Sequence, residues 1–468
     1  MWLREERSRA FGDSAVFQGT GPGSIGAEWE GPSDRPIMAP SRMTRSAAPS
    51  RHPRTIPAQL VRQVERSNRH EPLRLNTFTF VDLFSGCGGL GLGFLLAGVR
   101  PLAAIDNDRV SCNSHRLNFE RYRCMTIPTD LRRFKPRHLA SLLKEAHGTA
   151  RVDLLLGGPP CQGWSRAGRG KLKSLGLPTH RWENDPRNIL FKRFVRYVAH
   201  FRPKYFVMEN VPGMLSHRGT DATPHVIKAF SRIGYRAAMY ALDAVDFGVP
   251  QRRTRLFFIG SPRGSRLPVE NLVRPVADLN LYHRGRYVKQ PWHLTVRHAI
   301  MDLPRLATNH RLEISAYPPR RGRPPRYVRL MRAGLNGLLH DHVTRLHREM
   351  DRAAFRALRP GMKYEKLDDG LKRYRDDIFK DKYRKLSWDE PAGTVTAHLS
   401  HDCYTHIHPS QRRTISPREA ARLQSFPDGF RFCGNMGDRF RQIGNAVPPL
   451  LAYGIATALL ARLHKRRS

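Results

Sequence analysis

From Thr77 onward, short apolar runs alternate with segments whose apolar residues recur at helical spacing. Short apolar runs bounded by glycine or proline predict buried strands, and spacings of three and four residues predict one face of a helix. The predicted strands lie at 78–84, 102–105, 152–156, 205–208 and 255–260. A helix is predicted at 190–201. This alternation predicts a doubly wound, Rossmann-like α/β sheet with helices on both faces.

The pattern changes on both sides of this α/β region, which we place at 74–262. Residues 1–73 are rich in Gly, Pro, Ser and Arg and lack sustained apolar periodicity, which predicts a disordered N-terminal extension. Residues 263–410 are irregular and rich in Arg and Pro, which predicts a smaller basic domain. The capping-box pattern Ser416-Pro-Arg-Glu419 then opens a helix, so 411–468 is predicted to return to the α/β domain.

Charge points to the partner of the protein. The chain has 81 Lys and Arg against 40 Asp and Glu, a formal net charge of +41. Residues 263–385 alone contain 29 basic and 13 acidic residues, a net +16. Binding to a phosphate backbone explains such an excess, because each neutralised phosphate releases a counterion. Arg greatly outnumbers Lys, so compositional bias contributes too, and charge alone favours nucleic acid without deciding it.

The cysteine spacing and the hydropathy indicate the cellular compartment of the protein. The six cysteines form no C-x-x-C pair, which fits a reducing compartment. His401, Cys403, His406 and His408 are clustered, but a strand-like alternation explains them, so no metal is expected. No stretch reaches the roughly 18 apolar residues of a membrane span, and the N-terminus lacks a secretory signal core. We therefore expect a soluble cytoplasmic protein.

A glycine-rich turn follows the first strand. Residues 86–91 spell G-x-G-x-x-G, and Asp106 ends the next strand. This pattern predicts close approach of the backbone to a ligand and an acidic side chain on a ribose, which NAD, flavins and S-adenosylmethionine all offer. The additional glycines and the preceding Asp-Leu-Phe-Ser favour S-adenosylmethionine. Asp130 follows the next strand-like stretch and could accept a hydrogen bond from the adenine amino group; a surface acid or helix cap is the alternative.

The loop Gly157-Gly-Pro-Pro-Cys-Gln-Gly-Trp-Ser165 carries the candidate nucleophile. Two prolines place Cys161 on a rigid loop directly after a strand, and cysteine attacks as its thiolate. A small buried residue on a tight turn is the alternative. Glu209 also follows a strand, so it is expected at the same crevice. In Gln251-Arg-Arg-Thr-Arg255, Arg253 and Arg255 share one side of a strand, where they could grip phosphate, a base oxygen or the Glu209 carboxylate.

These motifs together resemble one family, the cytosine-5 DNA methyltransferases of bacterial type. The resemblance covers Phe78 to Gly260 and Arg413 to the C-terminus. It rests on DLFSGCGGLGLGF, GGPPCQGWS, MENVPG, VPQRRTRLFFIG, REAARLQSFPDGF and QIGNAVP. Trp164 departs from the Phe that is usual in the family. The basic residues 263–410 fall where the family has its target-recognition domain.

The resemblance implies the chemistry of the site. Cys161 would add to carbon 6 of a flipped cytosine, so that carbon 5 can take the methyl group of S-adenosylmethionine. Glu209 would donate a proton to ring nitrogen 3, and Arg253 and Arg255 would stabilise the base oxygen and orient Glu209. The implied cofactor contacts are Phe84, Gly86, Cys87, Asp106, Asn107, Asp130, Pro160 and Asn445.

Double-stranded DNA is the expected partner, and we expect a monomer in the bacterial cytoplasm, associated with the nucleoid. A cognate restriction endonuclease acting separately is a second partner that the family allows. An RNA cytosine methyltransferase would keep every motif, but the large basic insert favours DNA. A non-catalytic DNA-binding relative should have lost Cys161 or Glu209 and has lost neither. A cytosine deaminase would need the P-C-x-x-C pattern, and its second cysteine is missing here.

Overall fold

The structure is a computed structural model that describes residues 57–69, 71–160, 189–216, 222–264, 293–307, 312–318, 324–335, 337–362, 364–373 and 383–464. Cys161 and the rest of its loop through Ser165 lie outside these ranges.

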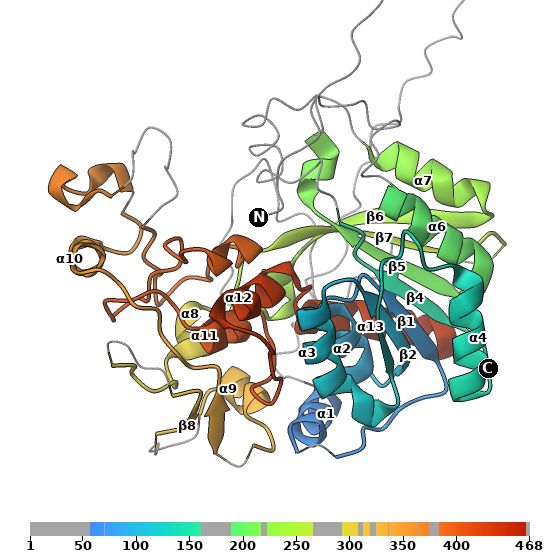
Figure 1. The fold of residues 1–468 in the computed structure, drawn as a ribbon, viewed down its shortest axis with the longest axis horizontal. Coiled ribbons are helices and arrows are strands. Elements are labelled where there is room, and N and C mark those ends of the chain that lie inside the picture. The colour runs from blue at the N-terminus through green and yellow to red at the C-terminus, as the bar shows by residue number, and fades with distance from the viewer. Residues whose placement is uncertain are drawn as a thin grey trace, which may run out of the picture. The chain divides into compact units, whose positions relative to one another are not determined.

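Seven strands form one sheet in the order β3-β2-β1-β4-β5-β7-β6 (Figure 1). The strands β1 to β5 run parallel, and β7 runs antiparallel between β5 and β6. Their bounds are β1 Thr79–Leu83, β2 Arg100–Asp106, β3 Met125–Pro128, β4 Leu154–Gly157, β5 Tyr205–Asn210, β6 Tyr235–Asp243 and β7 Thr254–Pro262.

Helices cover both faces of this sheet, because successive side chains of each strand point to opposite sides. Phe80 and Leu154 pack with α2 and α13, whereas their neighbours Val81 and Leu155 pack with α4, α6 and α7. The predicted doubly wound α/β class is therefore confirmed. The helix bounds are α2 Gly89–Leu96, α3 Arg109–Phe119, α4 Pro136–His147, α6 Ile189–Phe201, α7 Thr223–Arg232 and α13 Pro449–His464.

The contact between α2 and α13 depends on Gly93, which has no side chain. A Cβ at Gly93 would lie 2.3 Å from the Cβ of Ala452, so no larger residue fits there. The stretch Met436–His464 is apolar enough by composition to cross a membrane, but 72 % of its most apolar window is buried inside the protein. Its composition therefore agrees with packing in the core.

The strand order reverses between β1 and β4. At such a point the chain leaves neighbouring strands toward opposite faces, and a crevice opens outside their carboxyl ends. The loops that follow β1 and β4 are the glycine-rich turn and the start of the Cys loop, so the topology places both motifs at one crevice.

The remaining described elements come mostly from residues 293–445. Val296 and Ala299 of α8 join the core that contains α2 and α13, whereas Phe355, Tyr383 and Tyr404 form a separate core around α10. Part of the predicted basic domain thus shares the α/β core, and its boundaries at 263 and 410 stay a prediction. The bounds are α8 Val296–Ile300, β8 Ile314–Ala316, α9 Arg326–Met331, β9 Leu338–His340, α10 Glu349–Ala357, α11 Pro417–Leu423 and α12 Met436–Asn445. Short 3-10 turns lie at Glu120–Tyr122, Pro212–Ser216, Ala244–Phe247, Tyr364–Lys366, Asp369–Leu371 and Ala397–Ser400.

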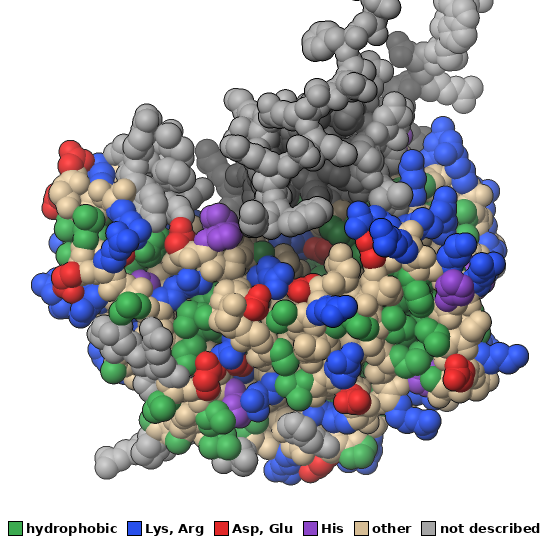
Figure 2. All heavy atoms as spheres, viewed as in Figure 1, with side chains coloured by type: hydrophobic (Ala, Val, Ile, Leu, Met, Phe, Trp, Pro, Cys, Tyr) green, Lys and Arg blue, Asp and Glu red, His purple; other side chains and the backbone are tan. Residues whose placement is uncertain are grey.

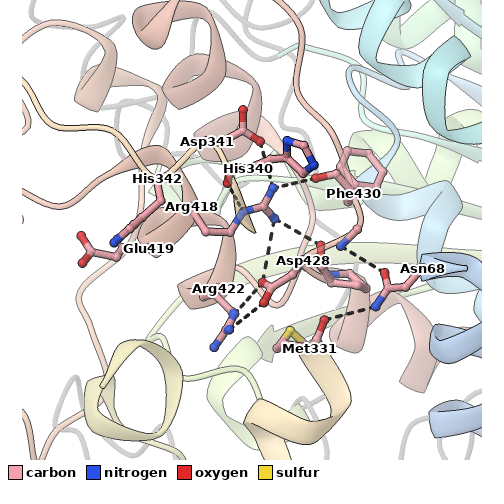
Figure 3. Close-up of polar contacts among 12 residues, drawn as sticks. Asn68, Met331, His340, Asp341, His342, Arg418, Glu419, Arg422, Asp428 and Phe430 are labelled. Atoms are coloured by element: carbon pink, nitrogen blue, oxygen red, sulfur yellow. Dashed lines mark hydrogen bonds and ion pairs between the residues drawn. The ribbon is translucent and has the colours of Figure 1, made fainter. Parts of the chain in front are cut away.

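Helix α11 carries a buried charge network (Figure 3). It begins at the predicted capping box, in which the Ser416 side chain accepts a hydrogen bond from the Glu419 amide. Two arginine side chains of the helix have no solvent exposure. Arg418 donates to Asp341 at 2.9 Å, and Arg422 donates to Asp428 at 2.6 Å. Because these acids come from other segments, the network ties the chain on both sides of α11 to the helix.

The prediction that residues 1–73 have no fold is wrong for Ala58–Asn68, which form helix α1. Leu60 and Val64, one turn apart, are buried in the same core as α2. Two apolar residues are too few to reveal a helical period in the sequence, and their burial depends on partners far along the chain.

The last residue of α1 fastens the helix to those partners. The Asn68 side chain is buried, donates to the carbonyl oxygen of Ala333 at 2.7 Å and accepts from the Gly429 amide at 3.1 Å. It also donates to the carbonyl oxygen of Met331 (Figure 3).

Asn68→Ala should lower the free energy of unfolding by about 1–3 kcal/mol, because it leaves buried backbone groups without a partner. Arg62→Ala, an exposed change on the same helix, is the control and should leave stability within about 0.5 kcal/mol of wild type. Urea denaturation of the full chain measures both. Equal stability of the two variants would contradict a structural role for α1.

Candidate active site

A cavity of about 440 Å³ lies at the crevice between β1 and β4. Loops after β1, β2, β4 and β5 line it, together with the segment that enters β7 and the end of α12. The predicted site residues among its lining are Phe84, Gly86, Cys87, Asp106, Asn107, Pro160, Glu209, Arg253, Arg255 and Asn445. The fold therefore brings together residues that are up to 361 positions apart, from Phe84 to Asn445.

The Asp106 carboxylate fixes the backbone of the glycine-rich turn through hydrogen bonds. Phe84 and Gly86 adopt left-handed backbone conformations, with φ of 58° and 55°. The Asp106 carboxylate accepts from the amides of Gly86 and Asp108, both at 2.8 Å. Burial raises the pKa of Asp106, and these two hydrogen bonds oppose that rise. Burial also raises the pKa of Cys87 to about 12, so its thiol is neutral in the cavity.

Three residues that the sequence analysis missed belong to the lining of this cavity and have buried polar side-chain atoms. The Ser85 hydroxyl and the Gln442 Oε1 are buried without a hydrogen-bond partner in the described chain. The Asp82 carboxylate makes no hydrogen bond of ordinary geometry there, and burial raises its pKa to about 7. An acid inside an apolar strand was the available signal for Asp82. Buried polar groups without partners indicate a polar ligand.

Glu209 contributes a mostly buried carboxyl group to the cavity, near Arg255. Its Oε1 lies 3.1 Å from Nε of Arg255, and each side chain is 14 % exposed. Burial raises the pKa of Glu209 above its ordinary value, while the charges of Arg255 and Arg253 oppose the rise. Gly158 lies so close that a Cβ there would stand 3.2 Å from Glu209 Oε2. The site therefore holds a carboxyl group that can bear a proton more readily than a surface glutamate.

Arg253 makes different contacts from Arg255. Its guanidinium donates to the carbonyl oxygens of Val395 at 2.6 Å, Gly444 at 2.8 Å and Ala446 at 3.0 Å. Its side chain is buried, and these acceptors belong to the segments before α11 and at the end of α12. Arg253 thus joins two later segments of the chain to the entrance of β7, and no described hydrogen bond links it to Glu209.

Two predicted residues are not among the described lining of the cavity. Cys161 is outside the described residues, but Pro159 and Pro160, which precede it, line the cavity. Asp130 is described and does not line the cavity; its carboxylate pairs with Arg132 at 2.6 Å, and this hydrogen bond lowers its pKa.

The histidine cluster near residue 400 has local partners. His406 Nε2 lies 3.2 Å from the carbonyl oxygen of Gly393, and His408 Nδ1 accepts from the Ser410 amide at 3.1 Å. Among the described residues, no group of three or more His, Cys, Asp or Glu is placed to hold a metal ion.

The sheet order and the glycine-lined cavity define the class as an S-adenosylmethionine-dependent methyltransferase fold. The C-5 cytosine-specific DNA methylase family matches residues 78–461. The chain is 34 % identical to the type II methyltransferase M.AgeI of Thalassovita gelatinovora, with 81 % of this chain and 98 % of that protein covered. It is 36 % identical to M.OihORF3336P of Oceanobacillus iheyensis, assigned as a type II methyltransferase, with 81 % and 94 % covered.

A crystal structure assigned to a DNA modification methyltransferase of an Escherichia coli prophage superposes with a TM-score of 0.62. It is 26 % identical, with 83 % of this chain and 100 % of that chain covered. The chain belongs to the C-5 cytosine-specific DNA methylase family. It is a DNA (cytosine-5-)-methyltransferase, and its cofactor is S-adenosylmethionine.

The raised pKa of Glu209 has a consequence for stability. A carboxyl group whose folded pKa lies above its unfolded pKa binds its proton more tightly in the folded state, so its contribution to stability falls as pH rises through that window. Glu209→Gln removes this dependence. The free energy of unfolding of the variant, relative to wild type, should therefore increase as the pH rises above about 4, the ordinary pKa of a glutamate.

Glu145→Gln on the exposed side of α4 is the matched control, and its difference from wild type should show a much smaller change with pH. Chemical denaturation at several pH values gives both curves. A pH-independent difference for Glu209→Gln would show that Glu209 titrates as an ordinary surface acid.

Proposed function

We propose that this enzyme methylates carbon 5 of a flipped cytosine within one specific sequence of duplex DNA, with Cys161 as nucleophile and Glu209 as proton donor. The observation that carries the assignment is the Glu209–Arg255 pair in a cavity that is also lined by Pro160, the residue directly before Cys161. A proton-bearing carboxyl group beside a thiolate suits attack on an aromatic base that must be protonated as it is attacked.

The lining residues fit the cofactor. Asp82 and Gln442 offer acceptor oxygens to an ammonium group, and the Ser85 hydroxyl offers a donor to a carboxylate. The loops of Asp106 and Asn107 would hold the ribose. Asp130 keeps its proposed contact with the adenine amino group only if it leaves Arg132. Bound S-adenosylmethionine supplies an electrophilic methyl group.

The chain's own residues carry out the remaining chemistry. The Cys161 thiolate forms a bond to carbon 6 of the base, and Glu209 gives its proton to ring nitrogen 3, so that carbon 5 becomes a nucleophile. After methylation, the proton at carbon 5 passes to solvent, the electrons of its bond expel the thiolate, and ring nitrogen 3 returns its proton to Glu209, which leaves 5-methylcytosine. Arg255 lies against Glu209 and would orient it and stabilise charge at the base oxygen. Arg253, whose hydrogen bonds go to backbone carbonyls, would position the surrounding segments.

Sequence choice would lie in residues 263–410, since base discrimination requires side chains at base edges in a groove. Figure 2 shows Lys and Arg side chains gathered on the face over α6 and α7 and around α10, where a phosphate backbone would be attracted. Because the similar proteins are type II methyltransferases, we place this enzyme in restriction–modification, with a separate cognate endonuclease. It would act as a monomer on cytoplasmic, nucleoid DNA.

Cys161→Ser should abolish methyl transfer from tritiated cofactor to duplex DNA while retaining cofactor binding, because a serine hydroxyl is a much weaker acid than a thiol and does not supply the attacking anion at neutral pH. A mixture of genomic duplex DNA and transfer RNA serves as substrate, with the two separated before counting. Label in the RNA alone would support the RNA methyltransferase alternative. Transfer by Cys161→Ser at a few per cent of the wild-type rate would remove Cys161 from the mechanism.

Substitutions of Arg255 and of Arg253 should have different effects on catalysis and on stability. Arg255→Gln should lower the single-turnover rate by about 10²-fold with a small change in stability. Arg253→Gln removes its hydrogen bonds to three backbone carbonyls, of which only that of Ala446 keeps another described donor, Nε2 of Gln424, and should lower the free energy of unfolding by about 3 kcal/mol. Single-turnover kinetics and urea denaturation are measured on each variant. A large loss of rate in Arg253→Gln and a large loss of stability in Arg255→Gln would show that Arg253 has the catalytic role and Arg255 the structural one.

A further inference from the structure

A second cavity, of about 370 Å³, lies between two segments of the predicted recognition region, residues 263–410, and a third segment at its C-terminal boundary, and it shares no lining residue with the active-site cavity. The segments are 305–307 after α8, 344–352 at the start of α10, and 410–413 before α11. Its basic lining residues are Arg305, Arg345, His347, Arg352, Arg412 and Arg413. No acidic residue is among the described residues that line it.

Gln411 holds two of these segments together. Its Oε1 accepts from the Leu306 amide at 3.1 Å and from Nε of Arg413 at 3.0 Å. Arg305 and Arg412 are the chain neighbours of these hydrogen-bonded residues, so two exposed cations stand on loops fixed to each other. Because the loops that carry these two arginines are already joined, only the side chains have to be ordered when an anion binds.

The other arginines of the cavity already have partners. Arg413 makes a two-pronged contact with Glu419, with both distances 2.7 Å, and Arg352 pairs with Glu349 at 2.9 Å. Arg345 donates to the carbonyl oxygens of residues 399–401. Within the described chain, Arg305 and Arg412 have no carboxylate within ion-pair distance, so their charges remain available to a ligand.

His347 adds a neutral donor. Its Nε2 accepts from the Thr414 amide at 3.2 Å, which leaves the proton on Nδ1. Burial lowers the pKa of His347 to about 4, so the ring stays neutral at physiological pH. The cavity thus offers two unneutralised guanidinium groups, a ring N–H and the exposed hydroxyl of Ser410. The guanidinium groups and the ring N–H can only donate, the Ser410 hydroxyl can donate as well as accept, and planar guanidinium forks match the oxygens of a phosphate.

We propose that this cavity binds one phosphate group of the DNA backbone and so fixes the recognition region on the duplex. The proposal rests on the proposed function, because it takes duplex DNA as the substrate. Arg305 and Arg412 are exposed, so a phosphate within a polymer can reach them as a free anion can. Such a contact positions the protein without reading sequence.

The test is the salt dependence of DNA binding by the full chain, measured without cofactor on a mixed-sequence duplex. A phosphate contact is independent of sequence, so the target site need not be known. In Arg305→Gln/Arg412→Gln, the slope of log K against log salt should become shallower by about 0.9, the value for one phosphate. The dissociation constant should rise roughly fivefold near physiological salt. Arg305→Lys/Arg412→Lys, which keeps both charges, should recover most of the slope.

Arg100→Gln/Lys144→Gln is the matched control, because it removes two exposed charges at the start of β2 and in the C-terminal half of α4. Its slope should equal that of wild type. An unchanged slope in Arg305→Gln/Arg412→Gln, or an equal change in the control, would overturn the proposal.

Calorimetric titration with inorganic phosphate alone separates the two sources of the anion. Inorganic phosphate that binds wild type but not Arg305→Gln/Arg412→Gln, with the DNA slope unchanged, would assign the cavity to a free anion and overturn the DNA contact. If the proposed function is wrong, the wild-type protein will transfer no methyl group to DNA. The salt dependence of DNA binding can still be measured in that case, so the two failures are distinguishable.

Discussion

The reversal of strand order between β1 and β4 is the constraint on which the site depends. Crossovers between parallel strands are right-handed, so the chain must pass to the other face of the sheet where the order reverses. The loops after β1 and β4 then diverge and leave the crevice that holds Asp106, Glu209 and Pro160. The antiparallel strand β7, paired with β5, places Arg255 against Glu209. The proposed catalytic carboxyl group, its arginine partner and the glycine-rich loop proposed to hold the cofactor meet at this crevice.

Buried arginines connect that crevice to the rest of the chain. Arg253 joins the entrance of β7 to segments near residues 395 and 445, and Arg418 and Arg422 join α11 to acids of other segments. A buried charge is tolerated only when its donors are satisfied, and loss of one partner costs several kcal/mol. These contacts therefore fix the end of α12, which lines the cofactor cavity, relative to the recognition region. The geometry of the site therefore depends on contacts between residues that are more than a hundred positions apart in the sequence.

The sequence predicted the features that arise from local pattern. Apolar runs located the strands, and Ser416 with Glu419 located the start of α11, because strand period and capping chemistry act over a few residues. Helix α1 was missed since its two buried apolar residues gain their partners only in the folded chain. The contacts of Arg253 could not be predicted either, because its acceptors lie 142 to 193 positions away. The motif predicted that Asp130 contacts the cofactor, whereas in the structure its carboxylate pairs with its neighbour Arg132.

The central claim is that this arrangement methylates cytosine at one specific duplex sequence. Bisulfite sequencing of the genome of a bacterial host that lacks cytosine-5 methylation, and that expresses the wild-type protein, tests it most directly. The account predicts cytosines protected from conversion at nearly every copy of a single short sequence and at few other positions. Complete conversion throughout the genome, or protection scattered without a common sequence, would contradict it.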